Sequence, residues 1–168
     1  TAIRICYEKG KSRSISFGEL IDNSNRFAIF LKYKGLKKGD SIDMMLEPSL
    51  EFYTSLFGTM KAGCVAVPLI TAFGPDGLSA RIDDCQPNLL ILAPEKSSLI
   101  SGINLETRIG DGTLLKELCN FDKEFVANTN SSDMAMYQYT SGTSRELPEA
   151  VKHRHKAIVT VMIAALYA

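Results

Sequence analysis

Hydrophobic and polar residues alternate along the chain with two different periods, and the changes of period predict a succession of strands and helices. Residues 2–7 and 14–17 alternate with a period close to two, on either side of Lys9-Gly10-Lys11. A period of two is typical of strands, and a glycine-containing stretch between two such runs is typical of a hairpin turn. The start of the chain is therefore predicted to form a β-hairpin.

A long amphipathic helix is predicted directly after this hairpin. Ser16 and Glu19 have the spacing of a capping box, in which each side chain bonds the backbone N–H of the other residue. The apolar positions of the predicted helix recur at helical spacing: Phe17, Leu20, Ile21, Phe27, Ala28 and Leu31. Residues three and four apart share one face of a helix, so we expect this face to pack against the core and Gly35 to end the helix.

A strand–helix–strand unit follows. Ser41–Leu46 predicts a short strand, and Pro48 suits the first turn of a helix. The face predicted to be buried on that helix consists of Tyr53, Leu56, Phe57 and Met60. Gly63 is expected to end the helix, and the apolar run Cys64–Val67 predicts a second strand. Two strands joined through a helix at this spacing favour a parallel sheet with a right-handed crossover.

The alternation of predicted strands and helices continues along the rest of the chain. The predicted elements are a helix at Asp76–Asp84, a strand at Leu89–Leu92, a short helix, strand and second helix within residues 94–120, a polar excursion at Asn120–Asp133, and strands at Met134–Tyr139 and Ala150–His153. An apolar helix starts near His155, and its run Ala157–Ala168 is too short to span a membrane, so we interpret it as a buried helix that lines the core. The predicted fold class is α/β, with a mostly parallel sheet flanked by helices.

The composition argues against some classes of function rather than indicating one. With 168 residues, 45% of them hydrophobic, the chain has the size and apolar content of one domain. Lysine plus arginine equals aspartate plus glutamate at 19 each, so the zero formal charge gives no support to nucleic acid or an acidic membrane as the partner. The N-terminus lacks a signal-peptide pattern, and we expect a cytoplasmic protein.

Neither the cysteines nor the histidines indicate a metal site. The four cysteines are far apart and no pair has C-x-x-C spacing: Cys6, Cys64, Cys85 and Cys119. Free thiols are therefore expected. His153 and His155 would share one face of a strand, but no third ligand stands at a suitable spacing. We expect His155 to act as a cap or a packing residue.

The residues best suited to bind a ligand are concentrated in the segment that follows Tyr139. Small hydroxyl residues surround a glycine there: Thr140, Ser141, Gly142, Thr143 and Ser144. Glycine lets the backbone approach a ligand closely, successive N–H groups form an anion-binding concavity, and hydroxyls donate hydrogen bonds to phosphate oxygens. An ordinary polar turn is the alternative for this composition. A Walker-type loop is excluded, because Gly142 is not followed by Gly-Lys at the required spacing.

Together with the residues that follow, this segment resembles the phosphate-binding signature of the adenylate-forming enzymes, the acyl-CoA synthetase superfamily. That signature reads Y-T-S-G-T-T-G-x-P-K-G-V before a His-containing tail, and residues 139–155 here read Y-T-S-G-T-S-R-E-L-P-E-A-V-K-H-R-H. Three upstream segments are also similar to landmarks of that family, in its order and at its spacing: Ser16–Leu20, Gly35–Asp40 and Met60–Leu69. The resemblance extends from about Ile15 onward, and the joint occurrence of the landmarks makes it specific.

The loop departs from the family pattern in ways that bear on ATP binding. One residue is inserted after Thr143, and Arg145 or Glu146 replaces an expected glycine. Glu149 stands where the family has lysine. Two unit charges about 5 Å apart interact by roughly 3 kcal/mol at an effective dielectric constant of about 20, so the reversed sign weakens phosphate binding severely if Glu149 faces the phosphates. Either Glu149 points away, or Arg145 or Lys152 supplies the charge, or the loop no longer binds ATP. Arg145 is the favoured substitute, because a guanidinium engages a phosphate bidentately.

The resemblance implies a ligase that activates a carboxylic acid with Mg-ATP to an acyl-adenylate and then forms a thioester with coenzyme A. It implies that the ATP phosphates are held by Thr140, Ser141, Gly142, Thr143, Ser144 and Arg145. Mg²⁺ would bridge phosphate oxygens, and no catalytic residue is expected within this chain. Aliphatic acids, as in fatty acid metabolism, aromatic acids and short-chain acids are all open as substrates.

Members of that family are much longer than this chain. We therefore interpret residues 1–168 as part of an N-terminal adenylation domain, cut within the helix that follows the loop. The chain alone is expected to be inactive in thioester formation and to expose apolar surface, through which it forms a homodimer or aggregates. A degenerate adenylation fragment that acts as a binding or scaffold module is the alternative, and a chance likeness in an unrelated α/β nucleotide-binding protein is a third interpretation.

Overall fold

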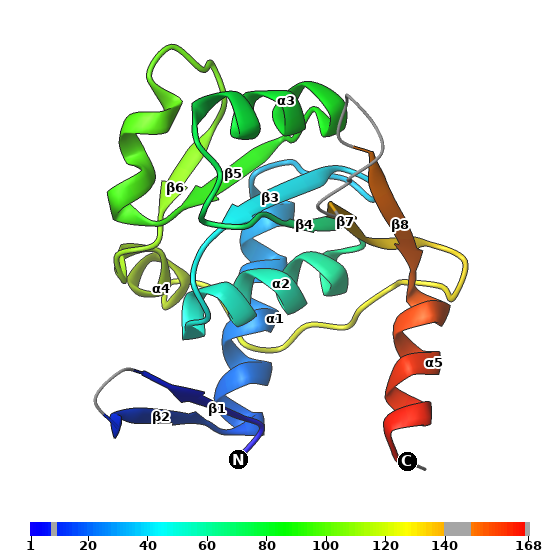
Figure 1. The fold of residues 1–168 in the computed structure, drawn as a ribbon. Helices are drawn as coiled ribbons and strands as arrows, with labels where there is room; N and C mark the ends of the chain where they lie inside the picture. The colour runs from blue at the N-terminus through cyan, green and yellow to red at the C-terminus, as the bar shows by residue number, and fades with distance from the viewer. Residues whose placement is uncertain (8–9, 140–148, 167–168) are drawn as a thin grey trace.

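A six-stranded sheet forms the centre of the protein in a computed structural model, which describes residues 1–7, 10–139 and 149–166 (Figure 1). The strand order is β6-β5-β3-β4-β7-β8. The strands are β3 (Ser41–Met45), β4 (Val65–Pro68), β5 (Leu89–Leu92), β6 (Thr107–Ile109), β7 (Met134–Tyr139) and β8 (Ala150–Arg154). Neighbouring strands pair in parallel except β7 and β8, which are antiparallel. The predicted α/β fold with a mostly parallel sheet is confirmed.

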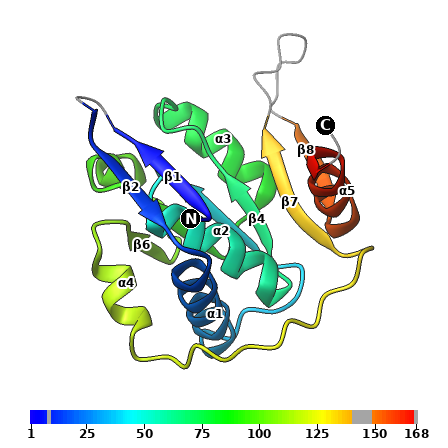
Figure 2. The ribbon, with the colours of Figure 1, turned by 90° about the horizontal axis from the view of Figure 1, so that it is seen from below.

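Helices cover both faces of this sheet (Figures 1 and 2). One face carries α1 (Phe17–Tyr33), α2 (Leu50–Ala62) and α4 (Thr113–Leu118), and the other carries α3 (Pro75–Cys85) and the 3-10 helix η2 (Pro94–Ile100). The side chains of β3 alternate between the two faces. Met44 packs in one core cluster with Phe27 of α1, whereas Met45 packs in the other with Leu78 of α3. The sheet therefore separates two apolar cores.

The predicted hairpin at the start of the chain is confirmed. Strands β1 (Ile3–Cys6) and β2 (Ser12–Ile15) pair antiparallel as a separate two-stranded sheet. Ile5 and Ile15 are buried in a small cluster together with Leu50 at the start of α2. The hairpin thus packs beside the helices rather than on the central sheet, as Figure 1 shows.

Helix α1 begins where its capping residues predict. The Oγ atom of Ser16 accepts a hydrogen bond from the backbone N–H of Glu19 at 3.0 Å, and the Glu19 carboxylate pairs with Arg13 at 3.2 Å. The second half of the predicted apolar face is fully buried at Phe27, Ala28 and Leu31. In the first turns, Leu20 packs against the small cluster of the hairpin, but Phe17 and Ile21 are 66% and 49% exposed, so the predicted face is wrong at these two positions.

Helix α2 differs from the prediction in its start and in its buried face. It begins at Leu50, after the N-cap Ser49, so Pro48 precedes the helix. Its buried positions are mostly small or polar: Leu50, Glu51, Thr54, Ser55, Gly58, Thr59 and Met60. A Cβ atom on Gly58 would lie 2.7 Å from the backbone oxygen of Ser24 in α1. The side of α2 that faces α1 therefore needs small side chains, which the apolar periodicity of the sequence does not reveal.

The prediction of a buried last helix is wrong for the described chain. Helix α5 (His155–Leu166) lies beside β8 and away from the central strands (Figures 1 and 2). Ile158 packs against a core cluster, but the exposed fractions of Val159, Val161, Met162 and Ile163 run from 51% to 69%. No other described element covers the outer side of this helix. The expected exposed apolar surface is thus present on α5.

Candidate functional site

The carboxyl ends of β3, β4, β5 and β7 lie at one edge of the sheet, because these strands run parallel. Strand β3 leads into α2 on one face, whereas its neighbour β4 leads into α3 on the opposite face. Open α/β sheets bind ligands where the connections of adjacent strands leave to opposite faces. In this fold that place lies between the carboxyl ends of β3 and β4.

Two polar side chains meet across this place. Glu47 follows β3, Thr71 follows β4, and the Thr71 hydroxyl donates a hydrogen bond to the Glu47 carboxylate. Both side chains come from connections rather than from the sheet itself. The contact joins the two connections at the edge where a ligand is expected.

The predicted phosphate loop connects β7 and β8 at this same edge. Tyr139, the last residue of β7, pairs with Ala150, the first residue of β8. The predicted phosphate-binding residues lie outside the described residues: Thr140, Ser141, Gly142, Thr143, Ser144 and Arg145. Glu149, in the position of the family lysine, is exposed just before β8. The fold thus brings both ends of the loop to the ligand-binding edge of the sheet.

Helix α3 contacts the strand that leads into the loop. The hydroxyl of Tyr139 donates a hydrogen bond to Oδ2 of Asp84 at 2.5 Å. The guanidinium of Arg81 lies 3.7 Å from the ring centroid of Phe73 and 5.3 Å from that of Tyr139. Burial, followed by the hydrogen bond to Asp84, raises the pKa of the Tyr139 hydroxyl, which therefore stays protonated and remains a donor.

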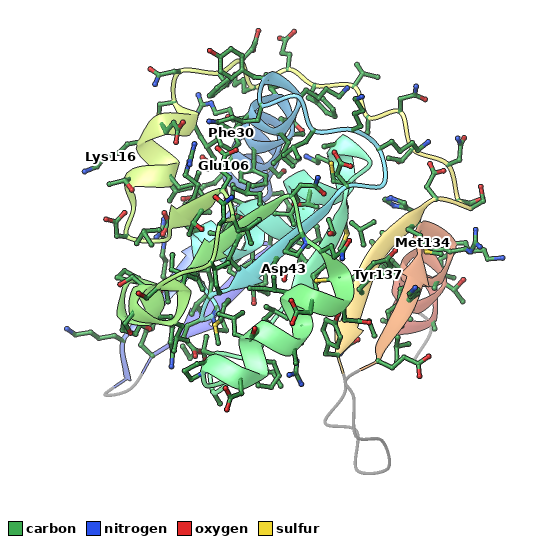
Figure 3. All side chains as sticks on the ribbon, turned by 90° about the horizontal axis from the view of Figure 1, so that it is seen from above. Phe30, Asp43, Glu106, Lys116, Met134 and Tyr137 are labelled. Carbon is green, nitrogen blue, oxygen red and sulfur yellow. The ribbon has the colours of Figure 1, made fainter. Side chains whose placement is uncertain are left out.

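A second polar contact lies deeper, between the central strand and α3. Figure 3 shows Asp43 on the central strand, on the side of the sheet that α3 covers. Asp43 is fully buried, and the Sγ atom of Cys85 lies 3.3 Å and 3.4 Å from its two carboxylate oxygens. Burial raises the pKa of Asp43 to about 7, against the opposing effect of the Cys85 hydrogen bond. Burial and the nearby Asp43 also raise the pKa of the Cys85 thiol, so this cysteine is not an activated nucleophile.

Other residues considered from the sequence have structural partners. Phe73, in the connection after β4, stacks against Arg81. The ammonium of Lys152, a candidate replacement for the family lysine, lies 5.3 Å from the ring centroid of Tyr137 on the neighbouring strand. His155, predicted to act as a cap or a packing residue, is half-buried at the start of α5, and its backbone N–H donates to the backbone oxygen of Asp133 at 3.0 Å.

Metal chemistry finds no support in the part of the chain that the structure describes. Within residues 1–7, 10–139 and 149–166, no group of three or more His, Cys, Asp or Glu side chains is placed to hold a metal ion. Cys6, Cys64, Cys85 and Cys119 are free thiols in this structure. Likewise, none of the described helices combines the length and the apolar character needed to cross a bilayer.

Comparison with known proteins decides the family. The model of the AMP-binding enzyme family matches residues 1–167. The chain belongs to this family. The acyl–CoA ligase YtcI of Bacillus subtilis, itself described as uncharacterized, is 27% identical over 158 residues. Nonribosomal peptide synthetase 7 of Aspergillus fumigatus is 26% identical over 169 residues. These matches cover 88% and 98% of this chain, but only 30% and 7% of the two relatives.

Solved structures of other proteins share this fold. Apo MatB from Rhodopseudomonas palustris superposes with a TM-score of 0.79 at 28% identity, and its ATP-bound form with a TM-score of 0.80 at 25% identity. In both comparisons the match covers 93% of this chain and 32% of MatB. The α/β core of this chain therefore corresponds to about a third of that structure, and the activity of the longer proteins is considered below as a proposal.

Sequence reasoning missed the side chains that connect α3 to the sheet. The sequence could have indicated Asp43, since it is a charged residue inside the apolar strand run Ser41–Leu46. The sequence could not have indicated Asp84 and Arg81, because polar residues are ordinary on the exposed face of an amphipathic helix. Their proximity to Tyr139, more than fifty positions away, arises only when β7 is placed beside β4.

Proposed function

We propose that this chain carries the ATP-phosphate-binding part of an adenylate-forming ligase that activates a carboxylic acid. The observation that supports the proposal most directly is the position of the Y-T-S-G-T-S segment. In a chain of the AMP-binding enzyme family, this segment follows β7 at the edge of the sheet where open α/β folds bind ligands.

In the proposed reaction, a carboxylate oxygen of the substrate attacks the α-phosphorus of ATP. A C–O–P linkage forms, the bond between the α-phosphorus and the bridging oxygen breaks, and pyrophosphate leaves. The loop from Thr140 to Ser144 supplies hydroxyl and N–H donors that orient the β- and γ-phosphates and stabilise the charge on the leaving pyrophosphate. The chain's own contribution is orientation and charge stabilisation, without a covalent intermediate on the protein.

Mg²⁺ would accompany ATP as a complex with its phosphate oxygens. Asp, Glu, His and Cys side chains of the described residues do not form a cluster suited to a metal ion. We therefore assign no residue of the described chain to Mg²⁺ and route no step of the mechanism through it.

Coenzyme A is the acceptor that we propose for the second half-reaction, in which a thiol attacks the acyl carbonyl and AMP leaves. The likeness to the acyl–CoA ligase YtcI supports this assignment. The likeness to a nonribosomal peptide synthetase supports a second candidate, in which the adenylate of an amino acid is passed on within a longer assembly. We further propose that the protein acts in the cytoplasm.

A scaffold function without nucleotide binding is the competing proposal, and Glu149 in the place of the family lysine supports it. A thermal unfolding experiment with and without Mg-ATP separates the two. A ligand at about 100 times its dissociation constant stabilises the folded state by roughly 2.7 kcal/mol, which is readily measured. We expect Mg-ATP to raise the unfolding temperature of the wild-type chain and to have little effect on Thr143→Val. An unfolding temperature unchanged by Mg-ATP in the wild type would favour the scaffold.

A further inference from the structure

The end of β7 that leads into the loop extends beyond its registered pairing with the central sheet. The register between β4 and β7 consists of the pair Ala66 and Met136. Strand β4 ends at Pro68, which has no N–H group to donate toward a neighbouring strand. Beyond this pair, β7 continues to Tyr139 in register with β8, the edge strand of the sheet. The side chains of the final residues of β7 can therefore add a further attachment to the body of the domain.

The side chain of Tyr139 provides such an attachment. Tyr139 is only 6% exposed and belongs to the core cluster beneath α3. Its hydroxyl lies 2.5 Å from Oδ2 of Asp84 and 3.5 Å from the backbone oxygen of Arg81. Both acceptors are on the last turns of α3, so the tyrosine ties the stem of the loop to this helix.

Arg81 contacts the ring of the tyrosine. Its Nη1 atom donates to the backbone oxygen of Gly77 at 2.7 Å, which fixes the guanidinium along α3. The same group stacks on Phe73 and lies near the ring of Tyr139. Cations over aromatic rings at these distances attract the ring face. Helix α3 thus contacts both the connection after β4 and the strand before the loop.

We propose that Asp84 and Arg81 are positioning residues that fix Tyr139, and through it the start of the phosphate loop. The inference rests on the proposed function of that loop in binding ATP. Neither side chain is assigned a contact with the nucleotide. Their effect passes through the backbone of Tyr139, which is covalently continuous with Thr140.

Limited trypsin digestion of the purified chain tests the attachment without any nucleotide. Arg145 is the only lysine or arginine in residues 140–148, so cleavage after it reports on the loop. Losing one hydrogen bond of this kind corresponds to about a fivefold change in the population of the attached state. We expect Tyr139→Phe and Asp84→Ala each to raise cleavage after Arg145 by about fivefold relative to cleavage after Lys123, which lies on an exposed irregular segment.

Three comparisons make this result decisive. Asp83→Ala, an exposed neighbour on α3, should leave the ratio unchanged. In the Asp84→Ala background, adding Tyr139→Phe should have a much smaller effect than in the wild type, because the short bond to Asp84 is already lost and only the 3.5 Å contact with the Arg81 oxygen remains to be removed. Equal increases at Arg145 and Lys123 would mean general destabilisation and would overturn the proposal, as would an unchanged ratio.

Titration with Mg-ATP distinguishes failure of this inference from failure of the proposed function. If the wild type binds Mg-ATP, we expect Asp84→Ala to weaken binding by about the same factor as it raises cleavage, and Asp84→Glu to restore part of it. Unchanged affinity together with unchanged cleavage would refute the positioning role while the proposed function stands. If the wild type does not bind Mg-ATP, the proposed function fails, and the cleavage ratio alone decides whether α3 holds the loop.

Discussion

Replacing Asp43 by asparagine is predicted to stabilise the protein at alkaline pH and to reduce the pH dependence of its stability. The carboxyl group is fully buried beneath α3, and burial raises its pKa from 3.8 to about 7. The folded state therefore keeps a proton that the unfolded chain loses near pH 4. Stability falls as the pH rises from about 4 to about 7 and changes no further above that range.

The size of the effect follows from this difference. A shift of one pKa unit corresponds to about 1.4 kcal/mol. Relative to its value below about pH 4, the raised pKa of Asp43 therefore lowers the free energy of unfolding by roughly 4 kcal/mol at pH 8 and by roughly 1 to 2 kcal/mol at pH 5. Asparagine has nearly the same shape and does not titrate. The advantage of Asp43→Asn over the wild type should therefore grow by roughly 2 to 3 kcal/mol between pH 5 and pH 8.

Urea unfolding followed by circular dichroism at both pH values measures this change. The titrations of other groups are common to both proteins and cancel in the comparison. Cys85 is the titratable group that contacts Asp43, and burial alone raises the pKa of its thiol, so the folded state keeps this thiol protonated at pH 5 and pH 8 in both proteins. Asp83→Asn is the matched control on the surface of α3 and should leave the pH dependence unchanged. The same stability difference at pH 5 and pH 8 would refute a buried, mostly protonated Asp43.

Further predictions concern the contact between α1 and α2 and the charge beside the loop. Gly58→Ala should lower the free energy of unfolding by about 1 to 3 kcal/mol in urea titrations, because its Cβ atom would overlap α1; an unchanged midpoint would contradict the close packing. Lys61→Met should cost about 1 to 3 kcal/mol by the same measurement, since its Nζ atom donates to the Ser24 hydroxyl at 2.7 Å, and a neutral effect would show that water replaces it. Glu149→Lys should tighten Mg-ATP binding by at least about tenfold in calorimetric titrations, because it reverses a charge beside the loop, whereas the surface control Glu124→Lys should not.

Much of the fold was predictable because apolar periodicity and capping residues are local signals. The buried strand runs Ser41–Leu46 and Leu89–Leu92 and the N-cap Ser16 were sufficient to place β3, β5 and α1. The polar face of α2 was not predictable, because small and hydroxyl residues such as Thr54 and Ser55 are buried only through the close approach of α1.

The last helix shows a different limit of sequence reasoning. An apolar run predicts burial, but it does not say which element provides the cover. Residues such as Val161 and Met162 are exposed because no described element lies over them. The candidate site was predicted as a loop from its composition, whereas the attachment of Tyr139 to α3 depends on long-range contacts that no local pattern contains.

Calorimetric titration of Mg-ATP into the chain tests the central claim most directly, when wild type, Ser141→Ala and the surface control Ser97→Ala are compared. The account predicts saturable binding to the wild type and to Ser97→Ala, and clearly weaker binding to Ser141→Ala, because a hydroxyl that donates to a phosphate is lost. Equal affinity in all three proteins, or no binding to any of them, would contradict a phosphate site in the loop between β7 and β8.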